Sequence, residues 1–125
     1  MSETFYTIRT HSFDTSHDVK HFRKEEDAIQ EILLREGDGK IILNQFADKG
    51  DIKDDMIYAV QTVDCEADDV NQFLYYKTRA NAIKQFKKIV KEYRHNNVHC
   101  IISDNGNYCD IGNDDFIEIV DHHLS

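Results

Sequence analysis

One short pattern occurs twice in this chain and limits what it can fold into. Residues 5–10 read FYTIRT and residues 57–62 read IYAVQT, and both alternate in the manner of a β-strand. Three further blocks recur in the same order: DVKHF (18–22) with DVNQF (69–73), Ala28-Ile29 with Ala82-Ile83, and KIIL (40–43) with HCII (99–102). The series predicts a tandem repeat of roughly 45 residues.

The first unit, about residues 5–44, reads strand, strand, helix, strand. Alternation predicts strands over 5–11 and 19–22, joined as a hairpin. A helix is expected over 24–36, because acids occupy its first turn and Gly37 follows its end. The apolar face of this helix consists of Ala28, Ile29, Ile32 and Leu33, whereas Leu34 lies off it.

The second unit, about residues 57–102, repeats this order with clearer signals. Strands are expected over 57–63 and 70–76, and a helix begins at the N-cap Thr78 and ends near His95, before Asn96-Asn97. The helical spacing of its apolar residues indicates burial along one side. These residues are Ala82, Ile83, Phe86, Ile89, Val90 and Tyr93.

Residues 98–121 add a hairpin and a final strand, the latter over 116–120. Asn105-Gly106 is the strongest hairpin signal in the chain, and a two-residue turn there requires positive φ at both positions. The resulting register pairs Ile101 with Asp110 and Ser103 with Tyr108, and it directs Cys100 and Cys109 towards the core.

These elements predict one α+β domain over residues 1–125. The expected architecture is a mostly antiparallel sheet with two helices on one face, built as a tandem ββαβ pseudo-repeat. A ferredoxin-like variant is the alternative topology, because each unit reduces to strand, helix, strand without its extra hairpin strand. An exposed edge strand in either half can pair with a second copy of the chain, so a homodimer is compatible with this architecture.

The composition predicts a cytoplasmic protein. We expect it to bind no membrane, and its overall charge disfavours direct binding of nucleic acid. The net charge of −9 opposes binding to polyanions. No apolar run approaches the roughly 20 residues of a transmembrane helix. The three cysteines lack a CxxC pair and nothing at the amino terminus resembles a signal peptide, which favours a reducing compartment.

Acidic residues gather in three places and form the first candidate interaction surface. Carboxylates on rigid loops imitate the phosphates of a duplex and steer a basic partner into contact. We therefore expect a protein partner with a basic surface or cleft, against the alternative of ordinary solvated loops. The predicted contact residues are Asp54, Asp55, Asp68, Asp69, Asp114 and Asp115.

Basic residues gather on the second predicted helix. A row of lysines lies opposite the buried stripe, namely Lys84, Lys87, Lys88 and Lys91, with His95 continuing it. A solvated helix face is one interpretation. The other is a contact surface for an acidic protein or a nucleic-acid backbone, with Tyr75 and Tyr76 as stacking groups if exposed.

Motifs for catalysis or cofactor binding are absent from the sequence. The stretch 104–115 lacks the ligand spacing of an EF-hand, and no zinc spacing links the seven histidines, which we interpret as surface residues. No nucleophile motif or glycine-rich phosphate loop occurs. We therefore expect no metal, no cofactor and no enzymatic activity.

In size and charge the chain resembles the small acidic proteins by which phages and mobile elements inhibit host defence enzymes, including nucleic-acid mimics. This resemblance implies a non-enzymatic protein that inhibits or regulates a nucleic-acid-handling partner by charge mimicry. A nucleic-acid-binding module using the basic helix is the second hypothesis. A small-molecule binder or enzyme, built in a cleft between the two repeats, is the third.

Overall fold

The computed structural model describes residues 3–12, 15–35, 39–64 and 71–125. Two helices and eight strands follow one another in this part of the chain. They are β1 (Thr4–Ser12), β2 (Thr15–Phe22), α1 (Glu25–Leu34), β3 (Lys40–Gln45), β4 (Met56–Val63), β5 (Asn71–Tyr76), α2 (Arg79–His95), β6 (Ile101–Ile102), β7 (Tyr108–Gly112) and β8 (Asp115–His123).

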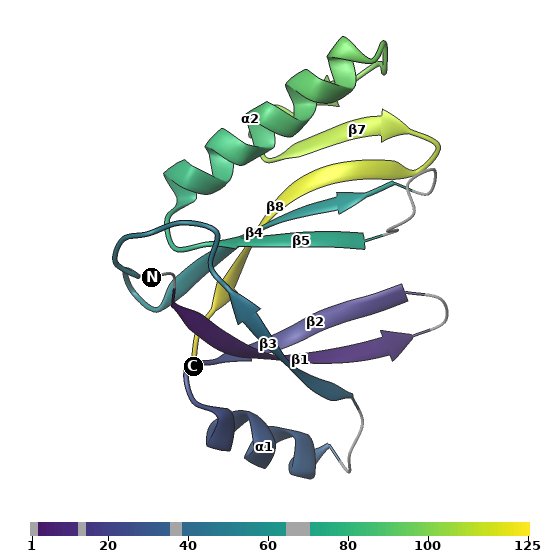
Figure 1. The fold of residues 1–125 in the computed structure, drawn as a ribbon. Helices are drawn as coiled ribbons and strands as arrows, with labels where there is room; N and C mark the ends of the chain where they lie inside the picture. Colours follow the sequence, from purple (N-terminus) through teal and green to yellow (C-terminus); the bar gives the residue numbers. More distant parts are fainter. Residues whose placement is uncertain (1–2, 13–14, 36–38, 65–70) are drawn as a thin grey trace.

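The strands form two antiparallel sheets, so the α+β class is confirmed. One sheet has the order β2-β1-β3 and the other the order β5-β4-β8-β7-β6. Helix α1 covers the outer face of the first sheet, and α2 covers the outer face of the second (Figure 1). This four-layer arrangement corrects the expectation of one sheet with both helices on one face, and it differs from the ferredoxin-like alternative.

Strand β8 produces this difference. It pairs with β4 over the full length of β4, from Met56 opposite His123 to Val63 opposite Phe116. In the five-stranded sheet β8 therefore lies beside β4. In the three-stranded sheet the corresponding place, beside β1, is taken by β3. Strand β6 lies at the far edge instead. The order ββαβ does occur twice along the chain, but the tandem duplication itself stays a prediction.

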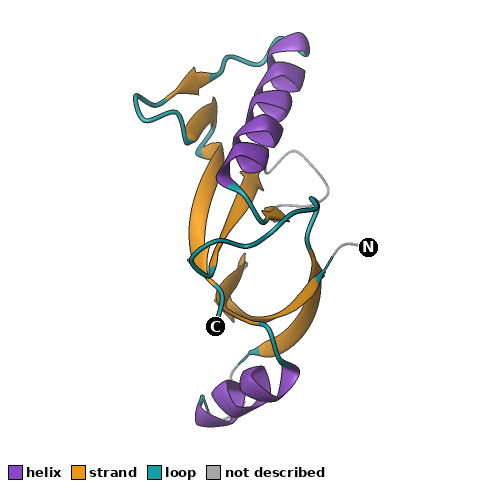
Figure 2. Ribbon diagram, turned by 90° about the vertical axis from the view of Figure 1, so that its left-hand side faces the viewer, coloured by secondary structure: helices purple, strands orange, loops and turns teal. Residues whose placement is uncertain are grey.

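The two sheets pack against each other around an apolar cluster. We call these residues the inter-sheet core; they are Phe5, Phe46, Ile57, Ala59, Tyr75 and Leu124, all buried. Two isolated bridges join the sheet edges at this end, one between Phe46 and Tyr75 and one between His21 and Leu124. The sheets therefore form a partly closed barrel, and the carboxyl terminus lies beside it (Figure 2).

Buried polar side chains flank the inter-sheet core. His21 is only 1% exposed, and its Nδ1 is hydrogen-bonded to Thr7 Oγ1 at 2.9 Å. Asn44 Nδ2 donates a second hydrogen bond, of 2.7 Å, to the same hydroxyl. The ring of His122 packs 4.5 Å from that of His21, measured between centroids. The interpretation of the histidines as surface residues is therefore wrong for His21.

Helix α2 forms as the sequence predicts. Its N-cap Thr78 accepts a hydrogen bond of 3.2 Å from the Asn81 amide, and the chain leaves the helix through Asn97, whose φ is +64°. Its apolar side packs on the five-stranded sheet. The buried residues of this core are Val60, Tyr76, Ala82, Phe86, Val90, Cys100, Cys109, Ile117 and Ile119.

Helix α1 buries much less than its apolar pattern suggests. Ala28 is fully buried against Ile8 and Phe22, but Ile29 is 42% exposed and Leu33 69% exposed. The first sheet has only three strands, so it is too narrow to cover the whole apolar face of the helix. An apolar strip is left on the surface.

The β6–β7 hairpin has the expected register but not the expected turn. Ile101 pairs with Asp110, and the Ser103 amide donates a 2.9 Å hydrogen bond to the Tyr108 carbonyl. Gly106 has a φ of +74°, whereas Asn105 does not have positive φ. The loop is therefore longer than two residues. The strands keep the predicted register because the loop is longer by one residue on each side of the predicted turn.

Replacing Leu124 with alanine should lower the free energy of unfolding by about 2–4 kcal/mol, because a fully buried leucine of the inter-sheet core is lost. Urea denaturation measures the change. The control is His123→Ala, whose side chain is exposed, and it should stay within about 0.5 kcal/mol of the wild type. If both substitutions lower the free energy of unfolding equally, the packing of Leu124 between the sheets does not stabilise the fold.

Candidate functional site

The predicted acidic contact residues lie at two distant places. Asp54 and Asp55 precede β4, whereas Asp114 and Asp115 lie where β8 begins. Because β4 and β8 run antiparallel along their full length, these two pairs stand at opposite ends, separated by about 25 Å. The remaining predicted acids, Asp68 and Asp69, lie outside the described residues.

Asp54 and Asp55 form a strained turn with a structural role. Their φ angles are +56° and +54°, in the left-handed region. The Asp55 carboxylate accepts a hydrogen bond from Arg23 Nη2 at 2.5 Å, and its carbonyl accepts one of 2.7 Å from the Leu124 amide. Both side chains are exposed, but Asp55 already has a cationic partner.

Asp114 and Asp115 differ in accessibility. Asp114 is exposed, with a φ of +65° in the turn that joins β7 to β8. Asp115 is only 5% exposed, so a partner has little of this side chain to contact. Of these two predicted contact residues, only Asp114 is therefore accessible to a partner.

Residues around Asp114 form what we call the acidic–aromatic surface. It lies on the face of β7 and β8 that points away from α2, because Cys109, Ile117 and Ile119 occupy the opposite, α2-facing side. Its members are Tyr108, Asp110, Asp114, Phe116 and Glu118. Asp110 and Asp114 are exposed, and the other three are half-buried.

Strand pairing sets the geometry of this surface. Tyr108 lies opposite Glu118, and Asp110 lies opposite Phe116, so aromatic and acidic residues alternate in a compact block. The diagonal pair, Tyr108 and Phe116, stacks with ring centroids 5.3 Å apart and an interplanar angle of 21°. The pairing of β7 with β8 therefore holds two aromatic rings between carboxylate groups.

Ionisation of this surface reflects its negative potential. Partial desolvation raises the pKa of Tyr108, and the charges of Asp110, Glu118 and Asp114 raise it further. Desolvation also raises the pKa of Glu118. A cation placed beside these groups would relieve the repulsion and would lower the pKa of Glu118.

Sequence reasoning missed Tyr108, Asp110 and Phe116 as members of a site. The hairpin register already placed Tyr108 and Asp110 on one face, which is the signal that could have found them. It did not suffice, because pairing between β7 and β8 is needed to add Phe116 and Glu118 to that face.

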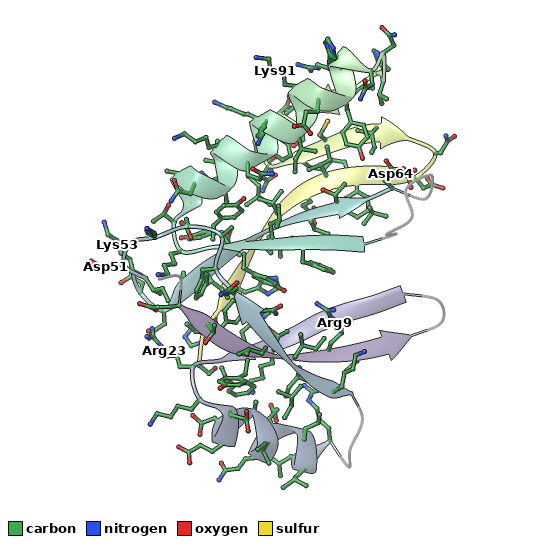
Figure 3. The ribbon with its side chains drawn as sticks, viewed as in Figure 1. Arg9, Arg23, Asp51, Lys53, Asp64 and Lys91 are labelled. Atoms are coloured by element: carbon green, nitrogen blue, oxygen red, sulfur yellow. The ribbon has the colours of Figure 1, made fainter. Side chains whose placement is uncertain are left out.

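The lysine row lies where the sequence places it. Lys84, Lys87, Lys88 and Lys91 are exposed on α2, and Lys91 points away from the sheet (Figure 3). Among the described residues, no acid lies within ion-pair distance of these four lysines. The row is therefore a basic face on the opposite side of the five-stranded sheet from the acidic–aromatic surface.

The two tyrosines that were expected to extend the basic face as stacking groups are buried. Tyr75 is 3% exposed and Tyr76 is 7% exposed, so the suggestion that they stack on nucleic-acid bases is wrong. Lys77 is also buried; its Nζ lies 3.7 Å from Glu3 Oε1 and 5.5 Å from the Phe46 ring centroid. Lys77 therefore belongs to the core rather than to the basic face.

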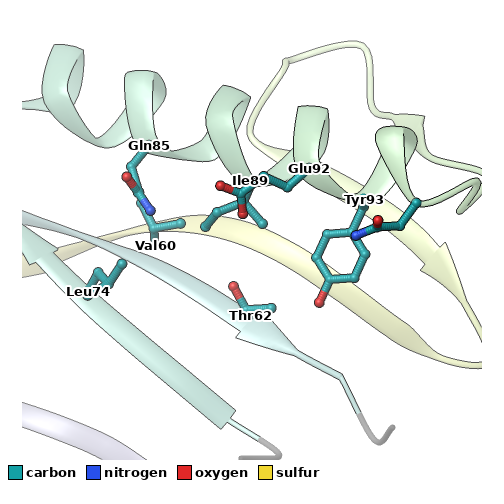
Figure 4. Close-up of a pocket in the computed structure, with 8 residues that line it drawn as sticks. Val60, Thr62, Leu74, Gln85, Ile89, Glu92 and Tyr93 are labelled. Carbon is teal, nitrogen blue, oxygen red and sulfur yellow. The ribbon is translucent and has the colours of Figure 1, made fainter. Parts of the chain in front are cut away.

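A pocket of about 400 Å³ lies between α2 and the strands β4 and β5 (Figure 4). Leu74 and Val60 contribute apolar surface on the strand side, and Tyr93 donates a 2.6 Å hydrogen bond to Asp64 near one end. The full lining is Val60, Thr62, Leu74, Gln85, Ile89, Glu92, Tyr93 and Asn96. It lies within the second half, rather than between the halves as the third hypothesis requires.

The pocket lining supplies one carboxylate from Glu92, side-chain amides from Gln85 and Asn96, and hydroxyl groups from Thr62 and Tyr93. Within the described ranges, no group of three or more His, Cys, Asp or Glu residues is arranged to hold a metal ion. No described helix is long and apolar enough to cross a membrane.

Comparisons with known proteins identify no relative. No family model matches the chain, and neither a curated protein sequence nor a solved structure shows significant similarity to it. The function must therefore be argued from the surfaces described above.

Replacing Glu118 with glutamine should stabilise the protein at neutral pH, by roughly a few tenths of a kcal/mol. The pKa of Glu118 is raised in the folded state, so ionisation is easier after unfolding and the contribution of Glu118 to stability falls as pH rises above 4.5. Urea denaturation at pH 7 and below pH 4 tests this. Well below pH 4.5 the difference should vanish; a difference independent of pH would contradict the assignment.

Proposed function

We propose that this protein is a non-enzymatic interaction protein that inhibits or regulates a partner protein with a basic surface or cleft. The partner docks on the acidic–aromatic surface. The observation that supports this proposal is the stacked pair of Tyr108 and Phe116 held among Asp110, Asp114 and Glu118.

The chemistry of this surface selects cationic side chains. Arginine guanidinium groups stack on aromatic faces and bind carboxylates through two parallel hydrogen bonds, and lysine is attracted to both groups. The β7–β8 ladder holds the aromatic and acidic groups in place before binding, which reduces the entropy cost of association. Net charge adds long-range steering of a basic partner.

The same charges favour a partner that handles nucleic acid. A basic cleft that binds phosphates is complementary to closely spaced carboxylates, so the surface competes with DNA or RNA for that cleft. A host defence enzyme, inhibited by a phage or mobile-element protein, is a partner of this kind. Inhibition then consists of blocking the cleft and requires no chemistry from this chain.

Affinity capture from the native host, followed by mass spectrometry, tests the proposal through a charge-matched pair of variants. The first is Asp110→Asn/Asp114→Asn/Glu118→Gln, and it removes three charges from the acidic–aromatic surface. The second is Glu25→Gln/Glu26→Gln/Asp51→Asn, and it removes three exposed charges that lie outside β7 and β8.

We expect the first variant to bind the captured partner at least about 10-fold more weakly than the wild type, and the second to bind within about 2-fold of it. Binding of the wild type should also weaken steeply with salt. Equal losses in both variants would mean that net charge, and not this surface, carries the interaction. Unchanged binding by the first variant would rule the surface out.

The exposed lysine face of α2 favours a second candidate function, direct binding of a nucleic-acid backbone. Its four lysines have no acidic partner among the described residues and follow one helix face. A mobility-shift assay with RNA and DNA at low salt tests it. If the candidate holds, Lys84→Gln/Lys87→Gln/Lys88→Gln/Lys91→Gln abolishes the shift, whereas the Asp110, Asp114 and Glu118 variant strengthens it. No shift with the wild type rejects this candidate.

A further inference from the structure

Two carboxylates lie side by side near one end of the pocket between α2 and the five-stranded sheet. The antiparallel register of β4 and β8 puts Asp64 opposite Asp115, one residue beyond the last paired residue of β4. Both side chains are on the α2 side of the sheet, because Thr62 lines the pocket and Ile117 belongs to the core under α2. Residues directly opposite each other have Cβ atoms about 4.5–5.5 Å apart, so two like charges meet here.

Asp115 is a buried acid with an unsatisfied oxygen. The residue is 5% exposed, and its Oδ1 atom has no hydrogen-bond partner among the described residues. No described Lys, Arg or His lies within ion-pair distance of it. Buried charges in proteins are normally paired, because removing an isolated carboxylate from water is very unfavourable. This place therefore favours a cation from outside the chain.

Tyr93 connects the two acids to the pocket. Its ring extends from α2 to the strands (Figure 4), and its hydroxyl donates a 2.6 Å hydrogen bond to Asp64 Oδ2. Burial raises the pKa of Tyr93 strongly, and the hydrogen bond to Asp64 and the charge of Asp115 raise it further. Both carboxylates therefore act on the same hydroxyl, and the Tyr93 end of the pocket has a negative potential.

Apolar surface continues from the Tyr93 end into the pocket. Val60, Leu74 and Ile89 line it, within a volume of about 400 Å³. A pocket of this size holds a small organic molecule. An inorganic ion beside the acids would leave the apolar lining uncovered. The combination of paired acids and aliphatic walls therefore points to an organic cation.

The cations on neighbouring turns of α2 are directed elsewhere. Lys88 and Lys91 are exposed members of the lysine row, and Lys91 points away from the sheet (Figure 3). Arg94 Nη2 donates a 3.3 Å hydrogen bond to the Cys100 carbonyl. None of the eight described lining residues is basic. The lining therefore presents no cation of its own to the two carboxylates.

We propose that this pocket binds a small primary amine, with its ammonium group beside Asp64, Asp115 and Tyr93 and its apolar body against the aliphatic walls. An ammonium group has three hydrogen-bond donors. The Thr62 hydroxyl, the Tyr93 phenol oxygen and the Asp64 carboxylate supply three acceptors at this end. The positive charge also offsets the repulsion between the two acids. The site is separate from the acidic–aromatic surface, which lies on the other face of β8.

An NMR titration of the isotope-labelled protein with phenethylamine tests the proposal. The probe should shift the backbone amides of Thr62, Ile89 and Tyr93, with a dissociation constant of about 1 mM or lower. Phenethyl alcohol and phenylacetate have the same shape without the positive charge, and neither should bind. Phenethyltrimethylammonium keeps the charge but has no donor, so it should bind at least about 10-fold more weakly.

Variants locate the ammonium group. Asp64→Asn and Asp115→Asn should each weaken phenethylamine binding at least about 10-fold, because each removes a charge beside the ligand. The matched control is Asp121→Asn, an exposed acid on the same strand and face as Asp115, and it should stay within about 2-fold of the wild type. Leu74→Trp should abolish binding by filling the pocket while leaving both acids in place. Circular dichroism and thermal denaturation check that each variant is folded.

Several outcomes would overturn the proposal. They are no phenethylamine binding by the wild type at about 10 mM, equal losses in Asp115→Asn and Asp121→Asn, and a Leu74→Trp protein that still binds. Shifts confined to the acidic–aromatic surface would assign the amine to exposed acids instead. Binding of Ca²⁺ or Zn²⁺ without binding of phenethylamine would assign the two carboxylates to a metal ion. None of these results bears on partner capture, which is measured on the other face of β8.

Discussion

The structure depends on the burial of one apolar cluster between two sheets. Phe5, Tyr75 and Leu124 come from the beginning, the middle and the end of the chain, and each is almost completely buried there. The bridges at Phe46 and His21 close the sheet edges around this cluster. Because both inner faces are used in this way, the helices can only pack on the outer faces, and each sheet acquires its own helix.

This arrangement separates the surfaces that are left to interact. The acidic–aromatic surface lies on β7 and β8, the lysine face lies on the outside of α2, and the apolar strip of α1 lies over the other sheet.

Local signals in the sequence predicted the order of the elements and several of their ends, although β2 and β8 are longer than expected, Thr15–Phe22 against 19–22 and Asp115–His123 against 116–120. Thr78 caps α2 because its hydroxyl satisfies a free amide, and Ile101 meets Asp110 because hairpin register depends only on nearby residues. The burial of His21 and Tyr75 could not be predicted in this way. Alternation shows that a strand has two faces, but the partner that covers each face is chosen by packing between residues far apart in sequence.

The sequence by itself determined the strands, the helices, the lysine row of α2 and the excess of acid. Only the tertiary structure decided which acids act together: it separates Asp54 from Asp114 along β4 and β8, and it joins Asp114 to Glu118 and Tyr108. The physical reason is that helix and turn signals are local, whereas a sheet surface is composed by strand pairing. Strand β8 could take its place beside β4 only through contacts that span half the chain.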